Sequence, residues 1–255
     1  MWWVSHAFAE PIEPGAGLPL AQGEVPEEQL FDKVTDLPDG RAEARGRKRR
    51  DGAFVVWALP TSSSIVRYQK LGAGGVVEDH LFDSDGYPLA TVWLERGVPT
   101  KATAAGVPPI DVSVTGWARQ PIPGGTMWLP AAPEERPGGG VRVEALSGGV
   151  DVWIDPPTTP PTDPFSDTFR DGLIAGCGCF VVDRAAAWID GRPGVRYRLL
   201  LPGNLPRDAV DLWAVNLGAS GLWLMTFEVG APADPIEALR SARALLPGID
   251  LTVRP

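Results

Sequence analysis

Hydrophobic and polar residues alternate along much of the chain after residue 52, with the two-residue period that is typical of β-strands. The alternation is clearest over Leu222–Val229, where every second residue from Trp223 is apolar, while Thr226 and Glu228 occupy the opposite face. Segments of this kind predict strands over Ala53–Leu59, Ile65–Lys70, Val76–Phe82, Leu89–Glu95, Val112–Trp117, Thr126–Leu129, Val141–Leu146, Val150–Ile154, Leu173–Val182, Ala187–Ile189, Val195–Leu201, Asp211–Leu217 and Leu222–Val229.

Turn sequences between these segments predict antiparallel pairing of neighbouring strands. The best of them is Asp83-Ser-Asp-Gly86, in which Gly86 can adopt the positive φ of a tight hairpin. Arg96-Gly97 reverses the chain again, and Gly218-Ala-Ser-Gly221 joins the last two predicted strands.

One helix is strongly indicated near the C-terminus, over residues 235–246. Asp234 can cap it, Pro235 suits its first position, and Glu237 completes a capping box. Apolar residues then fall on one stripe, and Pro247-Gly248 ends the helix. We therefore predict an α+β protein, mainly antiparallel β-sheet, with one well-defined C-terminal helix packed on the sheet.

Proline, glycine and charge divide the chain into five predicted parts. Residues 1–9 read as a signal-peptide remnant and 10–52 as a disordered leader or tether. A β-rich meander domain follows over 53–154, then a proline-rich linker over 155–164, and an α+β domain over 165–255.

The N-terminal residues predict export. Ala7-x-Ala9 has the small-residue spacing that a signal peptidase accepts, and Glu10-Pro11 opens a polar stretch. A basic segment before the apolar residues is missing, so an ordinary apolar N-terminus remains the alternative. On the export interpretation the protein is periplasmic or lies at the cell surface.

The sequence from Trp188 to Arg198, the strand Leu222–Val229 and the helix from Pro235 together resemble a known module. Residues 185–255 are similar to the PsbP/Mog1-like α/β sandwiches of exported bacterial proteins and lipoproteins. The resemblance implies a turn that leads into a strand, then a hairpin and a closing helix across the sheet. That family shares no catalytic residues, so none is implied here. No cysteine follows the predicted leader, which departs from the lipoprotein pattern.

The formal net charge is −9, which disfavours nucleic acid as a partner. No apolar run reaches the length of a membrane helix, so no membrane span is expected. One basic cluster interrupts the acidic chain. It either binds an anionic polymer or is a solvated segment whose positive charge balances the negative charge of the acidic residues before it. Its members are Arg45, Arg47, Lys48, Arg49 and Arg50.

Residues suited to catalysis are scarce. The chain has 2 histidines, and neither His6 nor His80 accompanies a nucleophile motif or a set of metal ligands, so no cofactor or metal is expected. Cys177-Gly-Cys179 is the one distinctive arrangement. Three interpretations stay open: a reduced buried pair, a structural disulfide, and a redox-active pair.

The 10 tryptophans either pack in the core and turns or form a binding surface, for which Trp93, Trp117, Trp128 and Trp153 are the candidate residues. We therefore expect a non-catalytic binding or structural component of the bacterial cell envelope, whose partner is another envelope protein or subunit. Two alternatives are an exported hydrolase and a thiol-redox protein that uses Cys177 and Cys179. The hydrolase would use carboxylates spread over several strands, such as Asp83, Asp85, Glu95 and Asp111.

Overall fold

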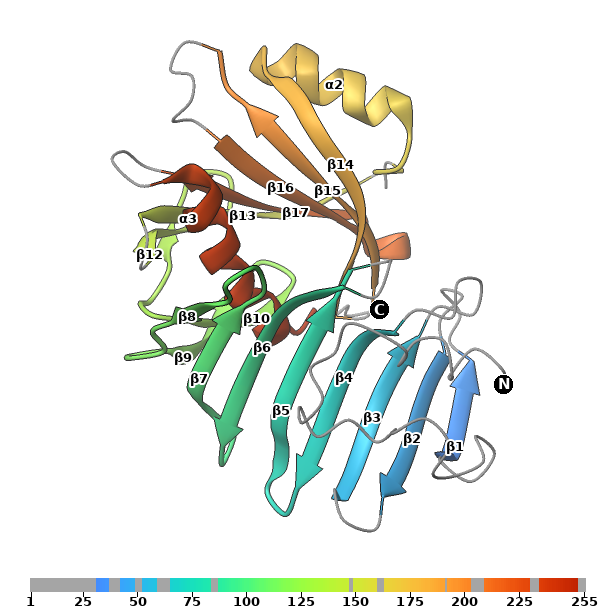
Figure 1. The fold of residues 1–255 in the computed structure, drawn as a ribbon. Coiled ribbons are helices and arrows are strands. Elements are labelled where there is room, and N and C mark those ends of the chain that lie inside the picture. The colour runs from blue at the N-terminus through green and yellow to red at the C-terminus, as the bar shows by residue number, and fades with distance from the viewer. Residues whose placement is uncertain are drawn as a thin grey trace.

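The computed structural model of the chain describes most residues from Phe31 to Leu251 and forms two large antiparallel sheets and a two-stranded ribbon (Figure 1). The described residues are 31–36, 42–48, 52–58, 65–83, 87–146, 149–159, 163–190, 192–202, 209–229 and 234–251.

The eight-stranded sheet is a simple meander in which each strand pairs with its neighbour in sequence. Its strands are β1 (Phe31–Asp36), β2 (Ala42–Lys48), β3 (Gly52–Ala58), β4 (Ile65–Gly72), β5 (Gly75–Phe82), β6 (Pro88–Glu95), β7 (Val98–Ala104) and β8 (Ile110–Val112). The predicted turn at Gly97 is confirmed, since this glycine has φ 78° and Glu95 pairs with Val98 across it. The strand predicted over Val112–Trp117 is wrong, because β8 ends at Val112 and residues 113–117 form a loop with a turn.

The seven-stranded sheet is built in the order β11-β12-β13-β17-β16-β15-β14. Its strands are β11 (Glu134–Glu135), β12 (Val141–Leu146), β13 (Val150–Thr158), β14 (Phe180–Ile189), β15 (Arg192–Leu200), β16 (Ala209–Asn216) and β17 (Leu222–Val229). The ribbon consists of β9 (Ala118–Ile122) and β10 (Gly125–Leu129).

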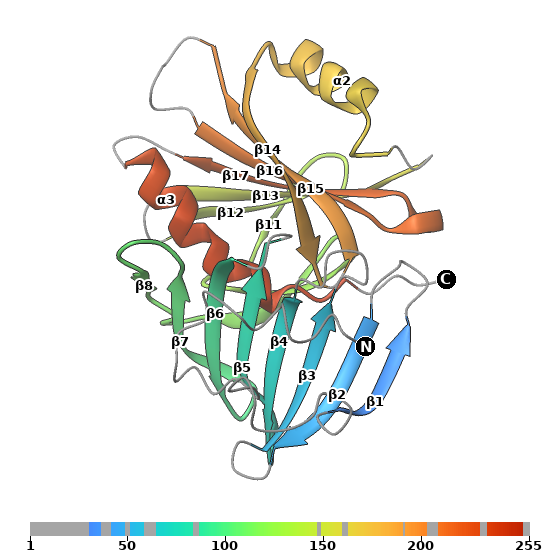
Figure 2. The same ribbon diagram turned by 45° about the vertical axis from the view of Figure 1, so that its right-hand side comes forward.

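Two helices belong to the second sheet. α2 (Asp167–Cys177) lies on its outer face, and α3 (Pro235–Ala242) lies between the two sheets (Figures 1 and 2). Asp234 caps α3 as predicted, because its Oδ1 accepts hydrogen bonds from the backbone N–H groups of Ile236 and Glu237. A 3₁₀ helix (Arg243–Gly248) continues α3 where the sequence predicted a longer α-helix. The α+β prediction, with a C-terminal helix packed on sheet, is confirmed.

α2 corrects a prediction, because its last turn occupies part of the segment Leu173–Val182 that we expected to be a strand. The side chain of Ser166 caps the helix by accepting from the N–H of Phe169 at 3.1 Å. Gly178, with φ 63°, ends it and donates to Ile174 O. The apolar run from Leu173 fits a strand and a helix equally well, and the two caps favour the helix.

The predicted linker 155–164 also begins as strand. β13 continues to Thr158 and pairs with β17, so the predicted domain boundary falls inside one sheet. Pro156 and Pro157 fit there because the pairing register shifts between Asp155 and Thr158, where their missing N–H groups interrupt no ladder.

Two strands also lie within 10–52, the expected leader. β1 and β2 extend the first sheet by pairing beside β3. Charged residues are typical of strands near a sheet edge, since backbone pairing requires no apolar side chains. Residues 1–30, with the predicted signal segment, lie outside the described residues.

One hydrophobic core joins the two large sheets. It contains Val92 and Ala102 of the first sheet, Phe227 of the second, and Leu239 and Leu245 from the segment between them. The meander and the C-terminal half therefore bury their apolar faces against each other. Among the described residues, no helix has the length and apolar character to cross a membrane.

Candidate functional site

α2 is held against the outer face of β14–β16 mainly through its two ends. At its N-terminal end the buried hydroxyl of Tyr197 donates to Pro164 O at 2.7 Å. The rings of Phe169 and Tyr197 lie 5.8 Å apart, and Arg184 donates to Phe165 O. Burial raises the pKa of Tyr197, which favours the protonated hydroxyl that this hydrogen bond requires.

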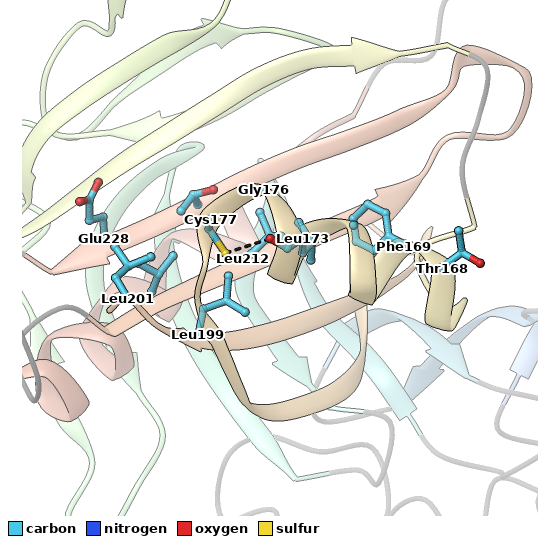
Figure 3. Close-up of a pocket in the computed structure, with 12 residues that line it drawn as sticks. Thr168, Phe169, Leu173, Gly176, Cys177, Leu199, Leu201, Leu212 and Glu228 are labelled. Atoms are coloured by element: carbon cyan, nitrogen blue, oxygen red, sulfur yellow. Dashed lines mark hydrogen bonds between the residues drawn. The ribbon is translucent and has the colours of Figure 1, made fainter. Parts of the chain in front are cut away.

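The C-terminal end of α2 is held by the cysteine pair. Cys177 and Cys179 are joined by a disulfide, with Gly178 in the left-handed conformation between them. Cys177 is exposed, whereas Cys179 is 2% exposed and packs against Tyr197 and Leu199. Cys177 Sγ also lies 2.9 Å from Leu173 O (Figure 3), a contact rather than a hydrogen bond since a disulfide sulfur carries no hydrogen. The disulfide thus connects the end of the helix to the sheet core.

Between these two attachments lies a cavity of about 600 Å³ (Figure 3). One wall is a single face of α2 and the other is the outer face of β15, β16 and β17. The lining residues are Thr168, Phe169, Gly172, Leu173, Gly176, Cys177, Leu199, Leu201, Val210, Leu212, Thr226 and Glu228. The walls are mostly apolar, so the cavity suits a small molecule with an apolar body.

Two glycines leave the cavity open. A Cβ atom added to Gly172 or to Gly176 would meet no atom within 4 Å. Both positions lie inside α2, where glycine is less favourable than alanine by about 1 kcal/mol each. No residue of α2 is fully buried. Phe169 and Leu173 pack against the sheet, and the two glycines leave the rest of the space beneath the helix unfilled.

Among the described residues that line the cavity, Glu228 is the only charged one. It lies near Leu201, at the end of the cavity away from Thr168 (Figure 3). Its cross-strand neighbours are Val210 on β16 and Asp151 on β13. Asp151 pairs with Arg142 at 2.5 Å, whereas Glu228 makes no ion pair or hydrogen bond within the described part of the chain. This carboxylate is therefore available to a cation.

Three of the four predicted tryptophans lie on separate strands and Trp117 lies in the loop before β9, and no two of their rings are in contact within the described residues. Trp93 on β6 lies under Lys101, and Trp128 on β10 lies under Arg119. Trp117 is 8% exposed and belongs to the core. These three contribute nothing to the α2 cavity.

Trp153 is the one that approaches the cavity. It lies on β13 directly opposite Thr226, a lining residue. The guanidinium groups of Arg136 and Arg142 lie 4.4 and 4.7 Å from its ring centre. Its surface is thus covered by cations rather than left free for a protein partner.

The other predicted residues lie apart from the cavity. Arg45, Arg47 and Lys48 are on β2, and Arg49 and Arg50 lie outside the described residues. His80 is a buried strand residue within 3.1 Å of the Thr91 hydroxyl. Within the part of the chain that the structure describes, no group of three or more potential ligands could hold a metal ion.

The scattered carboxylates of the hydrolase alternative do not converge. Asp83 accepts from Tyr87 N in the β5–β6 turn, Glu95 is exposed, and Asp111 pairs with Lys101 at the surface. Asp85 lies outside the described residues.

Comparison with known proteins finds no family model that matches the chain and no curated protein that is similar to it. Three residues that shape the cavity escaped the sequence analysis: Gly172, Gly176 and the unpaired Glu228. The glycines are four residues apart, the spacing of one helix face, but the helix had to be recognised before that spacing had meaning.

Proposed function

We propose that this chain is a non-catalytic binding protein of the bacterial cell envelope that takes a small molecule with an apolar body and a cationic group into the α2 cavity. The observation that carries the proposal is the apolar cavity with one carboxylate at its end, Glu228, which has no partner among the described residues. Its volume of about 600 Å³ lies within the range of about 300–1,000 Å³ that is usual for small-molecule sites.

The lining chemistry favours binding over catalysis. Leu199, Val210 and Leu212 form the floor, and burying an alkyl chain against them releases about 0.8 kcal/mol for each CH₂ group. Glu228 favours a cation because no described residue compensates its charge. The described residues of the wall include no histidine or lysine that could activate a nucleophile, and Cys177 enters it as a disulfide rather than as a thiolate.

Two observations support location in the envelope. The Ala7-x-Ala9 spacing before Glu10 fits signal-peptidase cleavage. The Cys177–Cys179 disulfide fits an oxidising compartment such as the periplasm. The PsbP/Mog1-like assignment of 185–255 stays part of this proposal, supported by the succession of the β14–β15 hairpin, β16, β17 and a closing helix.

The test compares two ligands of equal chain length and opposite charge, decyltrimethylammonium and decanoate, by isothermal titration calorimetry below their micelle concentrations. We expect the cation to bind about tenfold more tightly, and Glu228→Gln to abolish that preference. The matched control is Glu144→Gln, since Glu144 lies on the same face of the sheet but is 62% exposed and outside the cavity.

A second pair of variants locates the site. Gly172→Phe fills the cavity and is expected to weaken both ligands at least tenfold, whereas Ala175→Phe places the same ring on an exposed position of α2 that does not line the cavity. Equal binding to both phenylalanine variants, or no saturable binding by the parent protein, would overturn the proposal.

The thiol-redox alternative has one observation in its favour, the exposure of Cys177 beside a buried Cys179. An external dithiol would attack Cys177 Sγ, release Cys179 as a thiolate, and then leave as its own cyclic disulfide, so that two electrons reduce the protein. Trapping of a mixed disulfide at Cys177 by a monothiol, seen by mass spectrometry of the native protein, tests this alternative. If no adduct forms under conditions that reduce oxidised glutathione, the disulfide is structural.

A further inference from the structure

A cluster of arginines lies on the opposite face of β15 and β16 from the α2 cavity. Arg196 and Arg198 project from β15, and Arg243 begins the 3₁₀ helix after α3. They surround Asp211 of β16, whose side chain is fully buried. The side chains of the cluster therefore come from β15, from β16 and from the 3₁₀ helix that lies between the two sheets.

The cations outnumber the carboxylates in this cluster. Arg198 holds Asp211 with both Nε and Nη2, at 2.8 and 2.9 Å. Arg196 pairs with Asp183, whose side chain is 47% exposed. Arg243 Nη2 lies 4.0 Å from Asp211 Oδ2, and the Arg243 side chain makes no hydrogen bond within the described residues. Three guanidinium groups thus share two carboxylates, one of which faces solvent.

Hydrogen-bond donors are also left over. The Nε atoms of Arg196 and Arg243 and the indole Nε1 of Trp213 are buried without an acceptor among the described residues. Trp213 is the cross-strand partner of Arg196, so these donors lie on one face. Buried donors are normally paired, and each unpaired one destabilises a fold by about 1–3 kcal/mol.

The nearest further arginine does not share in the cluster's hydrogen bonds. Arg240 directs its guanidinium to the carbonyl oxygens of Ala105 and Pro108. Burial, together with the charge of Arg196, lowers the pKa of Arg243 to about 10, and the charge of Asp211 offsets this lowering only in part.

We infer that Arg196, Arg198 and Arg243 form a binding site for a small tetrahedral oxyanion of the phosphate type. An oxyanion supplies both the missing negative charge and the missing acceptors, and guanidinium groups bind phosphate through charge-assisted hydrogen bonds. A carboxylate offers only two oxygens, whereas phosphate can accept from guanidinium groups on more than one side. The side chains of Arg196, Arg198 and Arg243 remain 12%, 22% and 14% exposed, so each reaches solvent.

The experiment measures the melting temperature of the whole protein in sodium phosphate, sodium sulfate, sodium acetate and sodium chloride at equal ionic strength. We expect saturable stabilisation by phosphate and sulfate beyond that of chloride, and none from acetate. Arg243→Met is expected to remove the phosphate effect, while Arg96→Met, at an exposed turn, leaves it unchanged. Without phosphate, Arg243→Met is expected to match or exceed the parent in stability, because Asp211 compensates the desolvation of this guanidinium only in part.

Arg196→Met provides a second variant that keeps the Arg198–Asp211 pair, and it should weaken phosphate at least tenfold. Equal stabilisation by chloride, equal stabilisation by acetate, or a full phosphate effect in both variants would overturn the inference. This site and the α2 cavity lie on opposite faces of the sheet, so loss of phosphate binding has no bearing on alkylammonium binding.

Discussion

Arg67 and Asp190 are 123 residues apart in sequence, yet Arg67 Nη1 lies 3.1 Å from Asp190 Oδ1. The same guanidinium binds Asp79 through Nε and Nη2, at 3.0 and 2.7 Å, and donates to Pro247 O at 3.0 Å. One buried side chain therefore joins β4 and β5 of the first sheet to the β14–β15 turn and to the 3₁₀ helix. It fixes how the two sheets meet.

Arg67→Met should destabilise the protein by about 3–5 kcal/mol, because it leaves Asp79 and Asp190 without the cation that compensates them. The matched control is Lys101→Met. Lys101 pairs with Asp111 at 3.8 Å, and both side chains are more than half exposed, so we expect a loss of about 0.5 kcal/mol or less. Urea unfolding at pH 7 measures both. Similar losses for the two variants would refute the structural role of Arg67.

Glu78 predicts a pH dependence. The hydrogen bond with His80 lowers the pKa of Glu78, burial opposes this, and Lys70 adds to the lowering. Because the folded pKa lies below the unfolded one, the stabilisation is present above about pH 4.5 and is lost as the pH falls through the folded pKa. Glu78→Gln should cost about 1 kcal/mol at pH 7 and lessen the loss of stability towards pH 3. Urea midpoints at several pH values test this, with exposed Glu95→Gln as the control.

Substitution of alanine at two glycine positions is expected to have opposite effects on stability. Gly172→Ala places its Cβ in open space inside α2 and should stabilise that helix by up to about 1 kcal/mol. Gly194→Ala places its Cβ within 2.4 Å of Ala214 O, a backbone atom of the neighbouring strand, and should destabilise the sheet by about 1–3 kcal/mol. Amide exchange of α2 and urea unfolding measure the two effects. Gly194→Ala is not expected to slow amide exchange in α2. Slower exchange of α2 in that variant would contradict the local effect predicted for each glycine.

The disulfide should stabilise α2 locally rather than the whole fold. Cys177→Ser with Cys179→Ala is expected to speed amide exchange over 167–178 while the global stability falls by about 2 kcal/mol or less, since the closed loop is very short and no residue of α2 is fully buried. Hydrogen exchange with mass spectrometry distinguishes local opening of α2 from a loss of global stability. A uniform increase in exchange across both sheets would show that the disulfide supports the core.

Local features of the sequence determined much of the secondary structure. The cap at Asp234, Pro235 at the first position of α3 and the turn at Arg96-Gly97 act within a few residues, so their chemistry can be read without knowing the fold. Alternation with a period of two predicted β17 with its bounds unchanged. For the same reason the α+β class and the antiparallel meander could be derived from sequence alone.

Only the tertiary structure decided what the local patterns left open. The segment around Leu173 fits a strand and a helix equally well, and its fate depended on caps at Ser166 and Gly178 together with space above the sheet. The pairing of β13 with β17, which carried the sheet past the expected boundary, joins residues far apart in the chain. The cavity, the unpaired Glu228 and the arginines around Asp211 likewise arise only where distant strands meet. Periodicity shows which face of an element is apolar. Whether another element covers that face, and which one, depends on how distant parts of the chain pack together.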